Sequence, residues 1–193
     1  MVADLVSEKF DDAVLQEAQT VLADWDGDTS ADNRGAALAV LTGVQALGGQ
    51  YIENLSPPID AMRITASLLM RTHGRLDPEW GEVNRLIRGD VDMGLDGAPD
   101  VLRAIYGDPR LIDEDGKMKA LAGDTHIMIA DWSPDGTLRL DSIHQYGAAV
   151  LDETSPHYDD QAPLFVRGEY KPMPLSWDAV KQIAIEEYRP QDR

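Results

Sequence analysis

Apolar residues recur every three or four positions through the first two-thirds of the chain, which is the spacing of one face of an α-helix. The first run predicts a helical face made of Phe10, Val14, Ala18, Val21 and Trp25. Ser7 suits the N-cap of this helix, because a serine hydroxyl can accept a hydrogen bond from a free N–H of the first turn. Asp26-Gly27-Asp28 is expected to end it.

The same spacing predicts two further helices. One starts after Ser30 or Asp32 and ends at Gly48-Gly49, since glycine adopts the backbone conformation that closes a helix. The next is opened by Pro57-Pro58, because proline suits the first helical position, and Gly74 lies past its end. Its inward residues are expected to be Ile59, Met62, Ala66, Leu69 and Met70.

Two shorter helical pieces are expected after Gly74. Asp77-Pro78 has the form of an N-cap followed by proline at the first helical position, and predicts a short helix through Trp80, Val83 and Leu86. The stretch Asp100–Tyr106 is expected to form one or two more turns.

The pattern changes to that of β-structure near Gly123. Thr125–Trp132 and Thr137–Ile143 are typical of strands, and Ser133–Gly136 between them is a turn signal, so the segment predicts a β-hairpin. In it, Ile127, Ile129, Leu138 and Leu140 alternate with other residues. One hairpin is too little sheet to be stable alone. The scarcity of obvious partner strands indicates that the chain completes something larger.

The remaining C-terminal segment predicts a loop and a helix. Ser155–Pro174 is rich in proline and turn residues and is expected to be an ordered loop. Ser176 is expected to cap a last amphipathic helix through Val180, Ile183, Ala184 and Tyr188. The fold class is therefore α+β, within a single partial domain spanning residues 1–193. Residues 1–122 are expected to be mainly helical, and residues 123–193 to hold the hairpin, the loop and the final helix.

Composition narrows the function. The chain has 17 Lys and Arg against 35 Asp and Glu, a net charge of −18, which argues against nucleic acids and anionic membranes as partners. It has no cysteine, so thiolate metal sites, disulfides and cysteine nucleophiles are excluded. The N-terminal residues show neither a basic region nor a long apolar region, so no signal peptide is expected there and the compartment stays open.

One stretch, Ser155–Gln161, places serine, histidine and aspartate close together. In an extended chain Ser155 and His157 lie about 6.6 Å apart, from a rise of about 3.3 Å per residue, whereas a nucleophile and its base must come within about 3 Å. The stretch therefore favours a structural turn in which His157 and Asp160 bond local backbone. An independent hydrolase that uses these two residues with a distant serine is a minor alternative.

Metal-site signals are weak. Asp24, Asp26, Asp28 and Asp32 surround Gly27, but neither they nor the Asp113–Gly116 stretch match a calcium loop, so both are interpreted as caps and turns. The four histidines are His73, His126, His144 and His157, and no two have the spacing of a zinc helix. His126 and His144 lie in the two hairpin strands, where cross-strand packing is favoured over a metal site. Glu79 and Glu82 are interpreted as surface charge.

Four phrases, taken in order, resemble one known family. They are Leu22-Ala23-Asp24-Trp25-Asp26-Gly27; Trp80 to Asp90, which reads WGEVNRLIRGD and is followed by Gly97, Pro99 and Asp100; Gly123-Asp124-Thr125; and SPHYDDQ from Ser155 to Gln161, followed by Pro163-Leu164-Phe165. Together they resemble the C-terminal part of the β-chain of penicillin acylases and acyl-homoserine-lactone acylases. The resemblance extends from about Phe10 to about Tyr188.

The resemblance implies an N-terminal-nucleophile hydrolase with an αββα fold of stacked sheets between helical layers. In that family a serine exposed at the start of the β-chain attacks an amide, its own α-amine serves as base, and an asparagine with backbone amides holds the oxyanion. The family's oxyanion asparagine and calcium ligands lie upstream of the first phrase. The resemblance therefore implies no catalytic residue, no metal ligand and no cofactor in this chain.

What the resemblance carries over is structural. Trp25, Arg85, Asp90, His157, Asp160 and Gln161 are expected to fix loops and chain packing near the active-site scaffold, with a second possibility that one of them lies directly behind the residues that line the site. The implied partners are the remaining α- and β-chain segments, and the implied substrate is a small-molecule amide bound only by the assembled enzyme. Such enzymes are typically periplasmic. The alternative is a stand-alone binding or interaction module derived from that scaffold.

Overall fold

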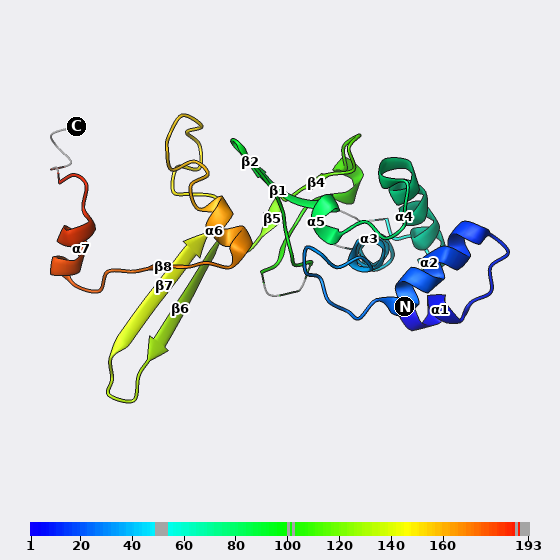
Figure 1. Ribbon diagram of the computed structural model, residues 1–193, viewed down its shortest axis with the longest axis horizontal. Coiled ribbons are helices and arrows are strands. Elements are labelled where there is room, and N and C mark those ends of the chain that lie inside the picture. The colour runs from blue at the N-terminus through cyan, green and yellow to red at the C-terminus, as the bar shows by residue number, and fades with distance from the viewer. Residues whose placement is uncertain (49–53, 100, 102, 188, 190–193) are drawn as a thin grey trace.

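The computed structural model describes residues 1–48, 54–99, 101, 103–187 and 189. Helices gather at the N-terminal end, small strands occupy the centre, and a long hairpin and the last helix reach away from them (Figure 1). This is a mixed α+β chain, as predicted. In the described part of the chain, no helix is both long and apolar enough to cross a membrane.

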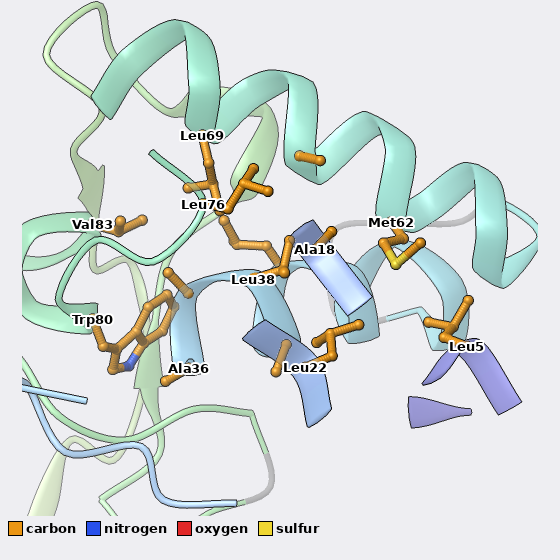
Figure 2. Packing of buried hydrophobic residues seen from close by; sticks show 14 of the residues in the cluster. Leu5, Ala18, Leu22, Ala36, Leu38, Met62, Leu69, Leu76, Trp80 and Val83 are labelled. Atoms are coloured by element: carbon orange, nitrogen blue, oxygen red, sulfur yellow. The ribbon is translucent and has the colours of Figure 1, made fainter. Parts of the chain in front are cut away.

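Four helices build the N-terminal part: α1 (Val2–Ser7), α2 (Ala13–Asp24), α3 (Ala36–Leu47) and α4 (Pro58–His73). Their apolar faces meet in one core, with Leu22, Leu38 and Met62 at most 1% exposed. Figure 2 shows these side chains converging from α2, α3 and α4, with Trp80 closing the core at one end. The predicted helices α3 and α4 are thus confirmed, although Met70 of α4 points outward at 38% exposure.

Helix ends follow local chemistry. Pro58 begins α4, and Gly74 ends it at φ 68°, where its N–H donates to the Met70 carbonyl oxygen. Gly48 ends α3 as predicted, and Gly49 lies outside the described residues. The prediction for Ser7 was wrong: Ser7 is the last residue of α1. Asp12 caps α2 instead, because its carboxylate lies 2.9 Å from the Val14 N–H nitrogen.

The buried face of α2 differs from the predicted one. Leu15, Ala18 and Leu22 are buried, whereas Val14 is 39% exposed. Helix α1, which the pattern did not predict, packs against α2, as do α3 and α4. The Gln19 side-chain amide donates to the Leu5 carbonyl oxygen at 2.8 Å and holds the two helices together.

The predicted short helix forms at Trp80 and Val83 but ends before Leu86, which lies in a strand. Only Trp80–Val83 is helical (α5), and β1 (Asn84–Arg88) follows directly, pairing antiparallel with β2 (Val91–Gly94) and parallel with β4 (Met118–Lys119). Leu86 lies opposite Met93 in this sheet. The two residues between β1 and β2 are Gly89-Asp90. A two-residue Gly-Asp connection is typical of a β-hairpin turn, and the helical interpretation does not account for it.

A second pair of strands replaces the helical turns expected at Asp100–Tyr106. Asp100 and Leu102 lie outside the described residues, but Ile105–Tyr106 forms β3 and pairs antiparallel with β5 (Ala122–Gly123). A short 3-10 helix, η1 (Pro109–Leu111), lies between them in sequence. Strand pairs of two residues carry almost no periodic signal, so local pattern could not reveal them.

The hairpin was predicted correctly. β6 (His126–Trp132) and β7 (Leu138–His144) pair along their full length, from His126 opposite His144 to Trp132 opposite Leu138. The turn closes with the Ser133 N–H donating to the Thr137 carbonyl oxygen at 2.9 Å. Successive side chains point to opposite faces, so this register places Ile127 and Ile129 on one face and Leu138 and Leu140 on the other.

The expected loop Ser155–Pro174 contains regular structure. Ala162–Arg167 forms helix α6, and β8 (Lys171–Pro172) pairs with β7. Phe165 of α6 is 1% exposed and packs with Leu86 and Ile143 in a second core. The prolines had indicated a loop, yet Pro163 lies in the first turn of α6, where proline is tolerated because its missing N–H is not needed.

The final helix, α7 (Trp177–Ile183), begins where predicted. The Ser176 hydroxyl oxygen accepts a hydrogen bond from the Ala179 N–H at 3.1 Å. The helix has no buried residue, and Trp177 is 79% exposed. Tyr188 lies outside the described residues. The helix therefore presents an amphipathic face that the described part of the chain does not cover.

Candidate functional site

The Trp25 phrase forms a tight loop in front of α3. The Trp25 indole N–H donates to the Asp28 carbonyl oxygen at 2.8 Å, and an Asp26 carboxylate oxygen accepts from the Asp28 N–H at 3.0 Å. The Ser30 hydroxyl, with backbone amides, holds the pKa of Asp28 below its ordinary range. Asn33 completes the loop, since its side-chain oxygen accepts from the first amides of α3.

This loop is tied to the Trp80 phrase by backbone hydrogen bonds. The Gly81 N–H donates to the Ala31 carbonyl oxygen at 2.7 Å, and the Trp80 N–H donates to that of Asn33 at 2.9 Å. The Trp80 indole N–H donates to the Gly97 carbonyl oxygen at 2.7 Å, and the Gly97 N–H donates to that of Thr29 at 2.9 Å. Two phrases far apart in sequence are thus joined through their neighbouring backbone.

Arg85 braces the β1–β2 hairpin. Its guanidinium donates to an Asp92 carboxylate oxygen at 2.8 Å and to the Gly81 carbonyl oxygen at 2.8 Å. Lys117 binds the other Asp92 carboxylate oxygen at 2.6 Å. Partial burial opposes ionisation of Asp92, but the hydrogen bonds from Lys117 and Arg85 outweigh it, so its pKa is lowered.

Arg88, at the end of β1, connects the Trp80 phrase to the SPHYDDQ phrase. Its guanidinium donates to the Val150 carbonyl oxygen at 2.6 Å and to that of Tyr158 at 3.3 Å. Its central carbon lies 3.6 Å from the Tyr158 ring centroid and 4.7 Å from that of Tyr146, within cation–π range. Sequence reasoning singled out its neighbours Arg85 and Asp90 and missed Arg88.

The turn beside Arg88 requires glycine. Gly89 has φ 56°, and a side chain there would place its Cβ 2.2 Å from an Asp159 carboxylate oxygen. That same oxygen accepts from the Asp90 N–H at 3.2 Å. Asp90 therefore contributes its backbone to the contact between the phrases.

An open cavity of about 560 Å³ lies at this junction. Arg88 and Lys119 line it with positive charge, and Asp90, Glu153 and Asp159 with negative charge. Hydrocarbon groups favour apolar walls, so this lining suits a polar ligand or ordered water rather than an acyl chain. These side chains can bind a polar ligand and fix its orientation. They include no activated nucleophile.

Ser155, His157 and Asp160 lie together but do not form a triad. The Ser155 hydroxyl oxygen accepts from the His157 backbone N–H at 3.2 Å, while the imidazole Nδ1 lies 2.9 Å from an Asp160 carboxylate oxygen. The serine hydroxyl is therefore held by backbone and not by the imidazole. The buried Gln161 follows, and its side-chain oxygen accepts from the His144 N–H at 3.1 Å.

The other histidines are separate. His126 and His144 face each other with ring centroids 4.8 Å apart. His73 lies beside Thr72 at the end of α4, and partial burial lowers its pKa, against the opposing effect of Glu82. Within the described ranges, no three or more His, Cys, Asp or Glu side chains cluster as metal ligands.

Glu79 and Glu82 have a structural use that sequence reasoning missed. The Glu79 N–H donates to a Glu82 carboxylate oxygen at 2.9 Å, as in a capping box at the start of α5. Asp77, expected to be the N-cap, instead pairs with Arg75 at 2.7 Å. The Arg75 hydrogen bonds lower the pKa of Asp77.

A comparison with models of protein families identifies the relationship. The model of the penicillin amidase family matches residues 1–182. The match covers all four phrases and every contact between them described above.

Proposed function

Because this chain belongs to the penicillin amidase family, we propose that it is the C-terminal segment of the β-chain of an acylase-type amidohydrolase. In this proposal the nucleophilic serine, the oxyanion asparagine and the calcium site belong to other segments, and the described residues supply scaffold. The assembled enzyme would have the αββα fold of N-terminal-nucleophile hydrolases. The chain would be inactive alone.

The proposed reaction is hydrolysis of the amide bond in N-acylated small molecules such as β-lactams or acyl-homoserine lactones. The serine oxygen forms a bond to the carbonyl carbon, the C–N bond breaks, and the amine leaves with a proton. Water then attacks the acyl-enzyme and releases the carboxylic acid. The role of this chain is to hold loops near that centre through the hydrogen bonds between the Trp25 loop and the Trp80 phrase and through the Arg88–Tyr158 contact.

The observation that carries the proposal is uncovered apolar surface. One face of the hairpin bears Met128, Trp132 and Leu140, and the first two are 54% and 66% exposed. Trp177 and Ile185 at the C-terminal end are 79% and 98% exposed. Side chains of this size gathered on elements that project from the core are typical of surfaces that pack against another segment.

Strand β6 adds a second reason. Among the described residues it pairs with β7 on one side, and its other edge carries free backbone N–H and C=O groups. Exposed edges are sites where further strands pair. We propose that strands of the other acylase segments continue the sheet here, which gives the hairpin the neighbours it needs.

The test is co-expression with the remaining α- and β-chain segments of the acylase, followed by an assay on chromogenic N-acyl anilides. We expect hydrolysis only from the combined segments. Trp132→Ser should reduce assembly and activity at least tenfold, whereas Leu111→Ser, which changes a similarly exposed residue (64%) outside the hairpin, should leave both unchanged.

The opposite result would favour the alternative. If the chain alone is monomeric, melts cooperatively and binds no hydrophobic dye, its apolar faces need no cover and the segment proposal fails. A stand-alone binding module would then be the function to pursue.

A further inference from the structure

The anchored end of the hairpin brings two imidazole rings together. His126 and His144 lie directly opposite each other on β6 and β7. Both side chains are exposed, their ring centroids are 4.8 Å apart, and the ring planes make an angle of 39°. The rings therefore share one face of the sheet and an approach open to solvent.

The backbone positions this pair closely. The His144 N–H donates to Gln161, which is 3% exposed, and so it does not point at β6. The two histidines are thus a non-hydrogen-bonded pair, the kind in which opposite side chains approach most closely. The next pair along is Ile127 opposite Ile143, and Ile143 is 1% exposed. The core and Gln161 therefore hold the frame on which the two rings stand.

The ring separation matches that of two imidazoles bound to one ion. A metal–nitrogen bond of about 2.0–2.1 Å places each ring centroid about 3.2 Å from the metal. Nitrogen–metal–nitrogen angles between right-angled and tetrahedral then put the centroids about 4.5–5.2 Å apart. The observed 4.8 Å falls within this range.

We propose that His126 and His144 together bind one divalent first-row transition metal ion, namely Zn²⁺, Ni²⁺ or Cu²⁺. Imidazole nitrogen suits these ions, whereas Ca²⁺ and Mg²⁺ take oxygen ligands. Over the described residues no third His, Cys, Asp or Glu joins the pair in a cluster. Water completes the coordination.

Calorimetric titration of the whole chain with Zn²⁺, Ni²⁺ or Cu²⁺ tests this proposal. We expect one ion per chain and, for Cu²⁺, the highest affinity. His126→Gln and His144→Gln should each weaken binding at least tenfold. The matched control is His157→Gln, which removes an exposed histidine that is paired with Asp160 instead and should leave binding unchanged. A large excess of Mg²⁺ should not displace the ion.

Two results would overturn the proposal. One is equal weakening by His157→Gln, which would indicate diffuse binding to the acidic surface. The other is unchanged metal binding in a chain that carries both His126→Gln and His144→Gln, with circular dichroism confirming that this variant is folded. Electron paramagnetic resonance of the Cu²⁺-loaded unmodified chain provides an independent measurement that needs no variant. Hyperfine coupling to two imidazole nitrogens is expected, and an all-oxygen spectrum would refute the site.

Discussion

Replacing Arg88 with methionine tests whether its guanidinium holds the segment 146–160 on β1. Methionine keeps an apolar stem and removes the charge. A hydrogen bond from a charged donor contributes about 1.5–3 kcal/mol. The bond to Tyr158 is long at 3.3 Å, and Val150 is 61% exposed, so water can replace part of the loss. One bond at about 1.5 kcal/mol and two ring contacts at about 0.5–1 kcal/mol each give about 2.5–3.5 kcal/mol.

Amide hydrogen exchange is the suitable assay, because this segment can open without global unfolding. The Ala149 N–H, which donates to the His157 carbonyl oxygen at 3.0 Å, reports on it directly. Its exchange in Arg88→Met should be roughly 60- to 300-fold faster, while amides of α3 and α4 should not change. Arg88→Lys should recover only part of the protection, since an ammonium cannot reproduce the planar contacts.

The control is Arg167→Met, which breaks an exposed ion pair with Glu169 and should change exchange in the segment by less than threefold. If Arg88→Met behaved like this control, the guanidinium would not be holding the two phrases together.

Three further predictions concern stability. Trp80→Phe removes the indole hydrogen bond and leaves a cavity at a 0% exposed site, so urea denaturation should show a loss of about 2–4 kcal/mol; an unchanged midpoint would contradict the packing. Gly89→Ala should lower the melting temperature, whereas Gly136→Ala, also at positive φ but facing open space, should do so less; equal effects would exclude the clash. The hydrogen bonds from Arg75 lower the pKa of Asp77 in the folded chain, so the stabilisation from ionised Asp77 is present above its ordinary pKa of 3.8 and is lost as the pH falls below that value. Between about pH 5 and pH 2, the free energy of unfolding should therefore fall more steeply with decreasing pH for the unmodified chain than for Asp77→Asn. Parallel curves would contradict this.

The elements that could be predicted are those with a long local period. The helices α3 and α4, with their proline and glycine ends, and the hairpin β6–β7 follow from spacing and turn residues alone. The same pattern failed at Leu86 and at Ile105, because strands of two to five residues hold too few positions to show a period. The predicted face of α2 was only partly right for a different reason: which residues it buries depends on the helices packed against it, which a local pattern does not contain.

The candidate site was also predictable only in part. The four phrases could be found from residue types and spacing alone, and the resemblance they support agrees with the family to which the chain belongs. Their contacts appear only in the folded chain: Arg88 against Tyr158, Trp80 against Gly97, and Gln161 against His144. These contacts join residues between 17 and 70 positions apart. Local periodicity encodes neighbours along one element, whereas contacts between elements depend on how the whole chain packs.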